Sequence, residues 1–164
     1  MPAWKQLRAI LLLPGMVTVV IPATILYFTG TGWPPPLWKI IIGCVSICLG
    51  LGLIVWTNRL FITVGHGTLA PWNPTQKLVV RGVYRHVRNP MITGVICILL
   101  GEAVFFGSLS LLCWFGFFFL VNMIYIPFGE EPGLEKRFGE DYLLYRQNVP
   151  RWIPRLTPWK DLSE

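Results

Sequence analysis

Two short polar segments hold the residues whose types and spacing could do chemistry. Residues 82–90 carry arginines, a histidine and the pair Asn89-Pro90, and the acidic pair Glu130-Glu131 ends an apolar run farther along. A helix opening at Asn89-Pro90 would turn the positive end of its dipole toward an anion such as a carboxylate. An acidic side chain on the same membrane face could hold an ammonium group. The pattern predicts a site for a small zwitterionic ligand.

Both segments also have a simpler interpretation. Arg81, Arg85 and Arg88 are typical of the positively charged inner face of any membrane protein. The acidic pair could be a charged stop at the membrane boundary that also favours the N-terminus of a following helix. Inner-face charge does not explain why Asn89-Pro90 should open a helix, so the binding hypothesis stands beside the structural one.

The rest of the chain has the composition of a membrane protein. Of its 164 residues, 54% are hydrophobic and 13% are charged, and the mean hydropathy is +0.57. A typical soluble domain has about 25% charged residues. We therefore expect one integral membrane domain over residues 1–164. The cysteines all lie in apolar runs without metal-ligand spacing, so we expect neither a metal site nor a disulfide.

The apolar segments predict an all-α, polytopic fold with four transmembrane helices. These helices are expected at about residues 7–28, 37–57, 91–106 and 109–128. A spanning helix needs about 20 apolar residues, so the third is short. Gly107-Ser108 is a tight link that should join the last two helices into a hairpin. Gly50-Leu51-Gly52 in the second helix is predicted to be a packing surface.

A further helix is predicted after the acidic pair. Leu134, Phe138, Tyr142 and Tyr145 recur at helical spacing with charged residues between them, which indicates an amphipathic helix. We expect this C-terminal helix to be cytoplasmic and to lie against the inner membrane face.

Basic residues set the orientation of the predicted spans. Of the 14 lysines and arginines, which begin with Lys5 and Arg8, only Lys39 would lie on the outer side. The sequence therefore predicts a multi-pass protein whose N- and C-termini are both cytoplasmic. Membrane lipids are the expected partner of this positive charge, and nucleic acid is not.

A few polar residues have more than one interpretation. Glu102 lies in the third predicted span, where ionisable groups are functional by default, yet it is near the outer end and could snorkel or pair. Asn122 is predicted to be an interhelical hydrogen-bond partner. His86 could be a base near neutral pH or simply an interfacial group. We favour structural roles for the first two.

Several residues together resemble the integral-membrane methyltransferases that include isoprenylcysteine carboxyl methyltransferase and the phospholipid N-methyltransferases. The similarity covers about residues 65–154, and the combination is more specific than any single piece. The residues that carry it are Leu78-Val79, Gly82-Val83-Tyr84-Arg85, Arg88-Asn89-Pro90-Met91, Gly94, Glu130-Glu131, Leu134, Phe138-Gly139, Tyr142, Tyr145, Val149-Pro150 and Pro154.

This resemblance implies S-adenosylmethionine as the methyl donor, bound at the cytoplasmic interface and released as S-adenosylhomocysteine. The cofactor-binding residues that it implies are Gln76, Lys77, Leu78, Val79, Tyr84, Arg88, Asn89, Pro90, Met91, Ile92, Glu130 and Glu131. No metal is required, and no catalytic residue is identified. Glu130, Glu131 and His86 are candidates to accept a proton from an amine.

Three positions depart from the family pattern. Asn89 stands where a histidine is usual, and Ile92 stands where a tyrosine is usual. Ile126 replaces the arginine that isoprenylcysteine enzymes carry about one turn before the acidic pair. Since that arginine is thought to hold the substrate carboxylate, a prenylcysteine carboxylate is a doubtful acceptor.

The leading hypothesis is methyl transfer to a lipophilic small-molecule acceptor, isoprenylcysteine-like or another lipid, at the cytoplasmic membrane face. A phospholipid amine is the alternative acceptor within the same class. A non-catalytic membrane module that retains the fold is the alternative from another class, and Ile92 gives it some weight.

Overall fold

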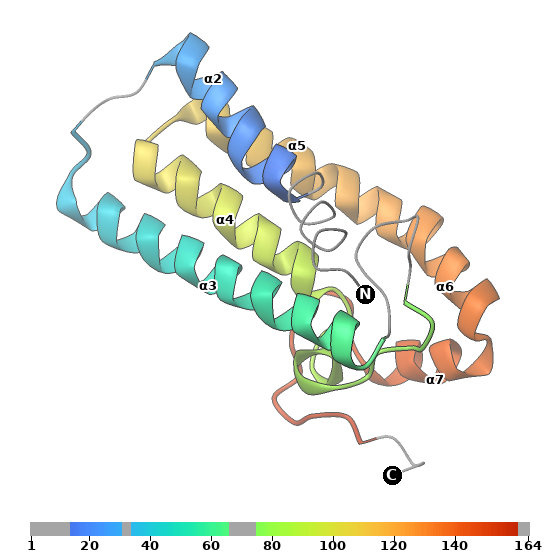
Figure 1. Ribbon diagram of the computed structural model, residues 1–164. Helices are drawn as coiled ribbons and strands as arrows, with labels where there is room; N and C mark the ends of the chain where they lie inside the picture. Colours follow the sequence, from blue (N-terminus) through green and yellow to red (C-terminus); the bar gives the residue numbers. More distant parts are fainter. Residues whose placement is uncertain (1–13, 31–33, 66–74, 161–164) are drawn as a thin grey trace.

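The computed structural model describes residues 14–30, 34–65 and 75–160, and every regular element in these ranges is a helix (Figure 1). Lys5, Arg8, His66 and the first part of the predicted span 7–28 lie outside the described residues. In chain order the elements are η1 (Met16–Val20), α2 (Ile21–Thr29), α3 (Leu37–Thr63), η2 (Gly82–Arg85), α4 (Pro90–Phe106), α5 (Leu109–Tyr125), η3 (Ile126–Glu130), α6 (Glu131–Phe138) and α7 (Glu140–Asn148).

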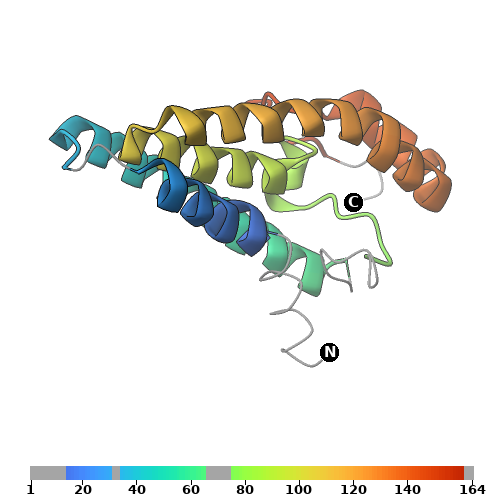
Figure 2. The same ribbon diagram turned by 90° about the horizontal axis from the view of Figure 1, so that it is seen from above.

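Four apolar helical segments lie side by side as a bundle (Figures 1 and 2). Helix α4 packs against both α3 and α5, and α2 packs against α5. Among the described residues, two helices, Leu37–Thr63 and Leu109–Phe138, are long and apolar enough to cross a membrane. The other two, Met16–Thr29 and Pro90–Phe106, are apolar but shorter. All four predicted segments therefore contain helix, and two of them meet the length of a span.

Two predicted boundaries were wrong. Helix α3 does not end near residue 57 but continues through Arg59 to Thr63, because no glycine or proline interrupts the chain there. The predicted amphipathic helix is divided at Gly139 into α6 and α7. Gly139 has φ +57° and ψ −130°, a conformation open to glycine but strained for other residues.

Facing glycines bring α3 and α4 together. A Cβ placed on Gly94 would lie 2.9 Å from the Gly50 carbonyl oxygen, and one on Gly101 would lie 2.8 Å from the Gly43 oxygen. Backbones can approach this closely only where no side chain intervenes, as in small-residue contacts of membrane helices. Gly50 thus belongs to the predicted packing surface, whereas Gly52 has nothing within 4 Å of its Cβ position.

The predicted hairpin of α4 and α5 is present. Gly107 ends α4 in the left-handed conformation, with φ +60°, as helix C-termini commonly do. Ser108 then caps α5 by accepting a hydrogen bond from the Leu111 N–H at 3.4 Å.

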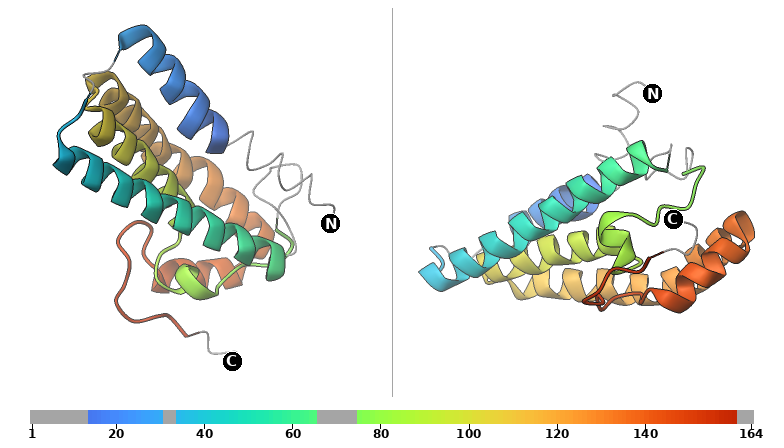
Figure 3. Two further views of the ribbon diagram at one scale, coloured as in Figure 1. Left: turned by 60° about the vertical axis from the view of Figure 1, so that its left-hand side comes forward. Right: turned by 90° about the horizontal axis from the view of Figure 1, so that it is seen from below.

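The opposite end of the bundle is where the other segments gather, and we call it the loop end (Figures 1 and 3). Residues 75–89, α6, α7 and the tail 149–160 lie there. The tail is held by backbone hydrogen bonds: the Arg88 N–H donates to Pro150 at 2.9 Å, and Arg155 donates to His86 at 3.0 Å. The Tyr145 hydroxyl donates to the Tyr84 carbonyl at 2.8 Å. These bonds fix segments that are distant in sequence.

We predict that Gly50→Ala destabilises the bundle and that Gly52→Ala does not. The Gly50 methyl would clash with the α4 backbone, and overpacking costs about 1–3 kcal/mol. The Gly52 methyl enters open space and can gain up to about 1 kcal/mol from helix propensity. Thermal unfolding in detergent checks this, and equal midpoints for the two variants would contradict the close α3–α4 contact.

Candidate active site

A cavity of about 500 Å³ opens at the loop end. Its size is within the range of small-molecule sites, about 300–1,000 Å³. Side chains from η1, the end of α3, residues 75–89, the start of α4, the continuous helix α5–η3–α6, and α7 line it. The cavity therefore depends on the packing of nearly every described element.

Most of the sequence-predicted cofactor residues line this cavity. Those that do are Leu78, Val79, Tyr84, Arg88, Asn89, Met91, Ile92 and Glu130. The other four do not line it. Gln76 and Lys77 are exposed, and Pro90 is buried in the first turn of α4. Glu131 is buried and forms ion pairs with arginines. The structure thus brings the segment before α4 together with the end of η3, across about forty residues of sequence.

Glu130 is presented to the cavity by a π turn. Pro127 has no N–H to donate within the helix, and the chain accommodates it in η3, a five-residue π-helix that ends at Glu130. Within the described part of the chain, the Glu130 carboxylate makes no hydrogen bond or ion pair. Glu130 is therefore a carboxylate at the cavity surface to which no described residue supplies a counter-ion.

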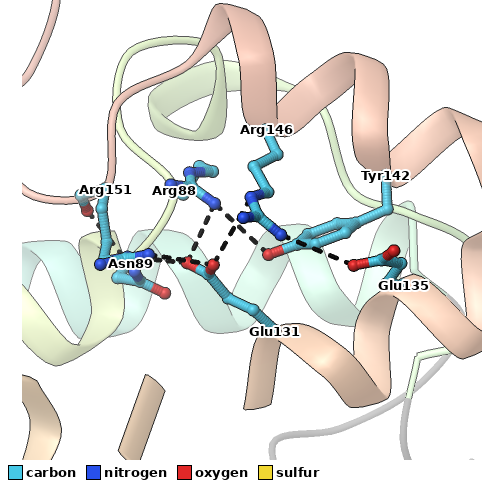
Figure 4. Close-up of polar contacts among 7 residues, drawn as sticks. All are labelled: Arg88, Asn89, Glu131, Glu135, Tyr142, Arg146 and Arg151. Carbon is cyan, nitrogen blue, oxygen red and sulfur yellow. Dashed lines mark hydrogen bonds and ion pairs between the residues drawn. The ribbon is translucent and has the colours of Figure 1, made fainter. Parts of the chain in front are cut away.

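Glu131 is instead surrounded by arginines (Figure 4). Arg151 donates to it through two atoms, Nε to Oε1 at 2.7 Å and Nη2 to Oε2 at 3.0 Å. Arg88 Nη1 lies 2.9 Å from Oε1, and Arg146 Nε lies 3.9 Å from Oε2. The Glu131 side chain is 4% exposed. A buried carboxylate needs such partners, so Glu131 serves to join segments.

Arg88 connects this ion cluster to the cavity. Its Nη1 also donates to the Tyr142 hydroxyl at 3.4 Å, and its side chain is 9% exposed. Its Nε is buried and has no hydrogen-bond partner among the described residues. Arg88 lines the cavity, so the site offers a cation as well as the Glu130 carboxylate.

The tyrosines of the site are held in the neutral form. Burial raises the pKa of Tyr84 well above its usual value, and Tyr145 and Glu130 raise it further. Burial likewise raises the pKa of Tyr142 and Tyr145, although Arg88 partly opposes both shifts. The hydrogen bonds that Arg151 donates to Glu131 raise the pKa of the Arg151 guanidinium. At neutral pH these phenols can donate hydrogen bonds but cannot accept protons as bases.

The predicted role of Asn89 as a helix cap is only partly right. Helix α4 does begin after Asn89, with Pro90 in its first turn. The Asn89 side chain makes no cap hydrogen bond, and its amide instead donates to the Arg151 carbonyl at 3.5 Å. Through this bond Asn89 joins the start of α4 to the tail.

Two other polar candidates lie away from the cavity. His86 Nδ1 is 2.8 Å from the Arg155 carbonyl oxygen, and since a carbonyl can only accept, Nδ1 is the donor of this bond. Glu102 lies in α4, and its Oε2 is buried without a hydrogen-bond partner in the described residues. Neither lines the cavity. Of the three proton-acceptor candidates, only Glu130 does.

Sequence reasoning missed part of the cavity lining. Leu134, Phe138, Tyr142 and Tyr145 were predicted only to form an amphipathic helix against the inner membrane face, and all four line the cavity. Their helical periodicity was the signal, but it could not show which surface they cover. Phe118, Asn122 and Tyr125 of α5 also line it, and in one sequence nothing distinguishes them from residues that face lipid.

An apolar helical bundle with a small-molecule cavity beside a charged cluster defines a membrane-associated protein with a ligand site at one end. The chain belongs to the phospholipid methyltransferase family, a family of methyltransferases, whose pattern it matches over residues 38–141. That range runs from α3 to the start of α7 and includes Glu130 and most of the cavity lining. The family resemblance expected from the sequence is confirmed. Neither the curated proteins nor the solved structures include a match.

We predict that Glu131→Gln destabilises the protein by about 3–5 kcal/mol, because it leaves a buried arginine without its counter-ion. Glu135→Gln is the matched control. Among the described residues Glu135 forms one ion pair, with Arg146 at 3.5 Å, and both side chains are nearly half exposed, so its loss should cost about 0–1 kcal/mol. Equilibrium unfolding in detergent measures both, and equal losses would contradict the joining role of Glu131.

Proposed function

We propose that the protein transfers a methyl group from S-adenosylmethionine to a lipophilic acceptor, of the phospholipid or a related lipid class, at the cytoplasmic face of a membrane. Membership of the phospholipid methyltransferase family supports the reaction class. The single observation that carries the cofactor assignment is that one cavity contains both the Glu130 carboxylate, which no described residue pairs, and the cationic side chain of Arg88.

The charges of the cavity fit a zwitterionic donor with a sulfonium. Glu130 would attract a cationic group, either the ammonium or the sulfonium, and Arg88 would attract the carboxylate. Tyr84 stacks on Phe61, with ring centroids 5.5 Å apart, and both line the cavity beside Leu78 and Val79, where they could contact an apolar or planar part of the ligand. Bound S-adenosylmethionine would supply an already activated methyl group.

The protein's part in such a reaction is alignment. A methyl group on sulfonium needs a nucleophile placed in line with it and water kept away. Leu134, Phe138 and the tyrosines of α7 cover the cavity from the loop end, where they would exclude water. Glu130 could also take up a proton from the acceptor.

We further propose that all four apolar helical segments cross the membrane, with both termini in the cytoplasm. Helix packing supports this arrangement for the two shorter helices, because α4 packs between α3 and α5, and α2 packs against α5. The excess of basic residues beyond the bundle supports the orientation. The cavity would then lie at the cytoplasmic interface, open to a soluble donor and near the lipid.

A methyl-transfer assay tests the proposed function. The purified protein, S-adenosylmethionine labelled in its methyl group and a total membrane lipid extract should give a labelled lipid, which mass spectrometry can identify. Failure to label any lipid, together with failure to bind S-adenosylhomocysteine in detergent by a folded protein, would favour a non-catalytic module instead.

We predict that Glu130→Gln weakens the binding of S-adenosylhomocysteine by about 10- to 100-fold, because a charge-assisted contact is worth about 1.5–3 kcal/mol. Glu102→Gln is the control, since Glu102 is also a carboxylate in an apolar helix but does not line the cavity. Isothermal titration calorimetry measures both affinities. A similar loss for the two variants would count against the assigned site.

A further inference from the structure

Asn122 presents an unused hydrogen-bond acceptor to the cavity. It is 8% exposed and lines the cavity from α5. Its Nδ2 donates to the Phe118 carbonyl at 2.8 Å, which also fixes the amide orientation because a carbonyl cannot donate. Within the described residues, Oδ1 has no hydrogen-bond partner. Asn122 was expected to join helices, but its bond is within its own helix.

This acceptor is open to a ligand. Asn122 lines the cavity, and its Oδ1 is not among the buried side-chain atoms that lack a partner in the described residues, so water can bond to it when the cavity is empty. A ligand that donates an N–H or O–H to Oδ1 would replace that water. The position of Asn122 therefore points to a ligand group that carries an N–H or O–H.

The position of Asn122 along the helix indicates which part of the cavity its amide faces. Glu130 lies eight residues farther on and lines the same cavity, so the two side chains are separated by no more than about 12 Å along the axis. One turn in the other direction, Phe118 lines the cavity together with Val95 and Val17. The amide thus lies between the charged end and an apolar end.

We propose that Asn122 positions the methyl acceptor by accepting a hydrogen bond from the atom to be methylated, and that this atom is an amine nitrogen or a hydroxyl oxygen. The proposal rests on the methyltransferase function proposed above and adds a residue that positions the acceptor. The lipophilic part of the acceptor occupies the apolar end, and its N–H or O–H faces Oδ1.

A carboxylate acceptor fits this place poorly. It has no proton to offer Oδ1, and Glu130, the ionisable group on the same helix facing the cavity, would repel it. Ile126, which lies between Asn122 and Glu130, is 1% exposed and offers no cation. Arg88 is the cation that lines the cavity, and in the proposed function it holds the carboxylate of the methyl donor, so it is not available to a second carboxylate.

The bond changes are those of a simple displacement. The lone pair of the acceptor atom forms a bond to the methyl carbon, while the methyl–sulfur bond breaks and its electron pair stays on sulfur. The proton of the acceptor then passes to Glu130, directly or through water, because an amide oxygen is too weakly basic to keep it. Asn122 is a positioning residue in this step and exchanges no proton itself.

Asn122→Leu tests the proposal, with Asn148→Leu as the matched control. Asn148 makes the same local bond, from Nδ2 to the Leu144 carbonyl at 2.8 Å, but it is exposed and away from the cavity. We expect Asn122→Leu to lower methyl transfer to the lipid extract by about tenfold, the effect of one lost hydrogen bond. Its affinity for S-adenosylhomocysteine should stay within about twofold of that of the unaltered protein, and Asn148→Leu should change neither value.

A second variant keeps the test decisive if Asn122→Leu does not fold. Asn122→Ser keeps a hydroxyl that can bond to the Phe118 carbonyl and still accept a hydrogen bond, so it should retain more transfer than Asn122→Ala. Equal transfer by those two variants, or unchanged transfer by Asn122→Leu, would overturn the role of Asn122 while leaving the methyltransferase function intact.

The product reveals the acceptor class. A methylated carboxylate is an ester, which releases labelled methanol in mild alkali, whereas N-methyl and O-methyl ether products keep the label. Retained label supports the proposal, and mass spectrometry then separates nitrogen from oxygen. Released methanol overturns the proposed class. If the unaltered protein binds S-adenosylhomocysteine but labels no lipid, both this inference and the proposed activity fail, and only the cofactor site stands.

Discussion

The arrangement of the loop end depends on the buried carboxylate of Glu131. It contacts Arg88 before α4, Arg146 on α7 and Arg151 in the tail, so one side chain on α6 holds three other segments. Each of these segments contributes to the cavity or supports one that does. Three guanidinium groups around one carboxylate leave net positive charge, and Arg88 is the most buried of the three, with 9% of its side chain exposed against 28% for Arg151 and 46% for Arg146.

The adjacent carboxylates of Glu130 and Glu131 have different environments and so different uses. Neighbouring residues on a helix point about 100° apart, which turns Glu131 into the arginine cluster and Glu130 to the cavity. The compensated carboxylate stabilises the fold. Glu130, which no described residue pairs, is available to a cationic ligand. In the same way, two carboxyl groups of one active site can have different roles because their surroundings differ.

The features that could be predicted from the sequence are those set by local residues, and the features that could not are set by contacts between distant residues. The apolar helices were predictable because hydrophobicity is a property of the segment itself, and the Gly107-Ser108 turn because its residues favour that local geometry. The break at Gly139 was missed because glycine is also tolerated inside helices. Other features depend on contacts between residues far apart in the chain, which local patterns do not reveal. These are the different environments of Glu130 and Glu131, the bond from Asn89 to Arg151 and the position of Asn122 at the cavity.

The π turn at η3 bears on the spacing of the chain. A π turn contains one more residue than the α-helical path it replaces, so η3 sets the angular position of everything after it. Adding or removing one residue in α5 would rotate Glu130 and Glu131 together by about 100°, carrying one out of the cavity and the other out of its arginines. The number of residues between the Ser108 cap and Glu131 is therefore fixed by the geometry of the site. In homologous sequences, an insertion in this segment should be accompanied by a deletion of the same length within it.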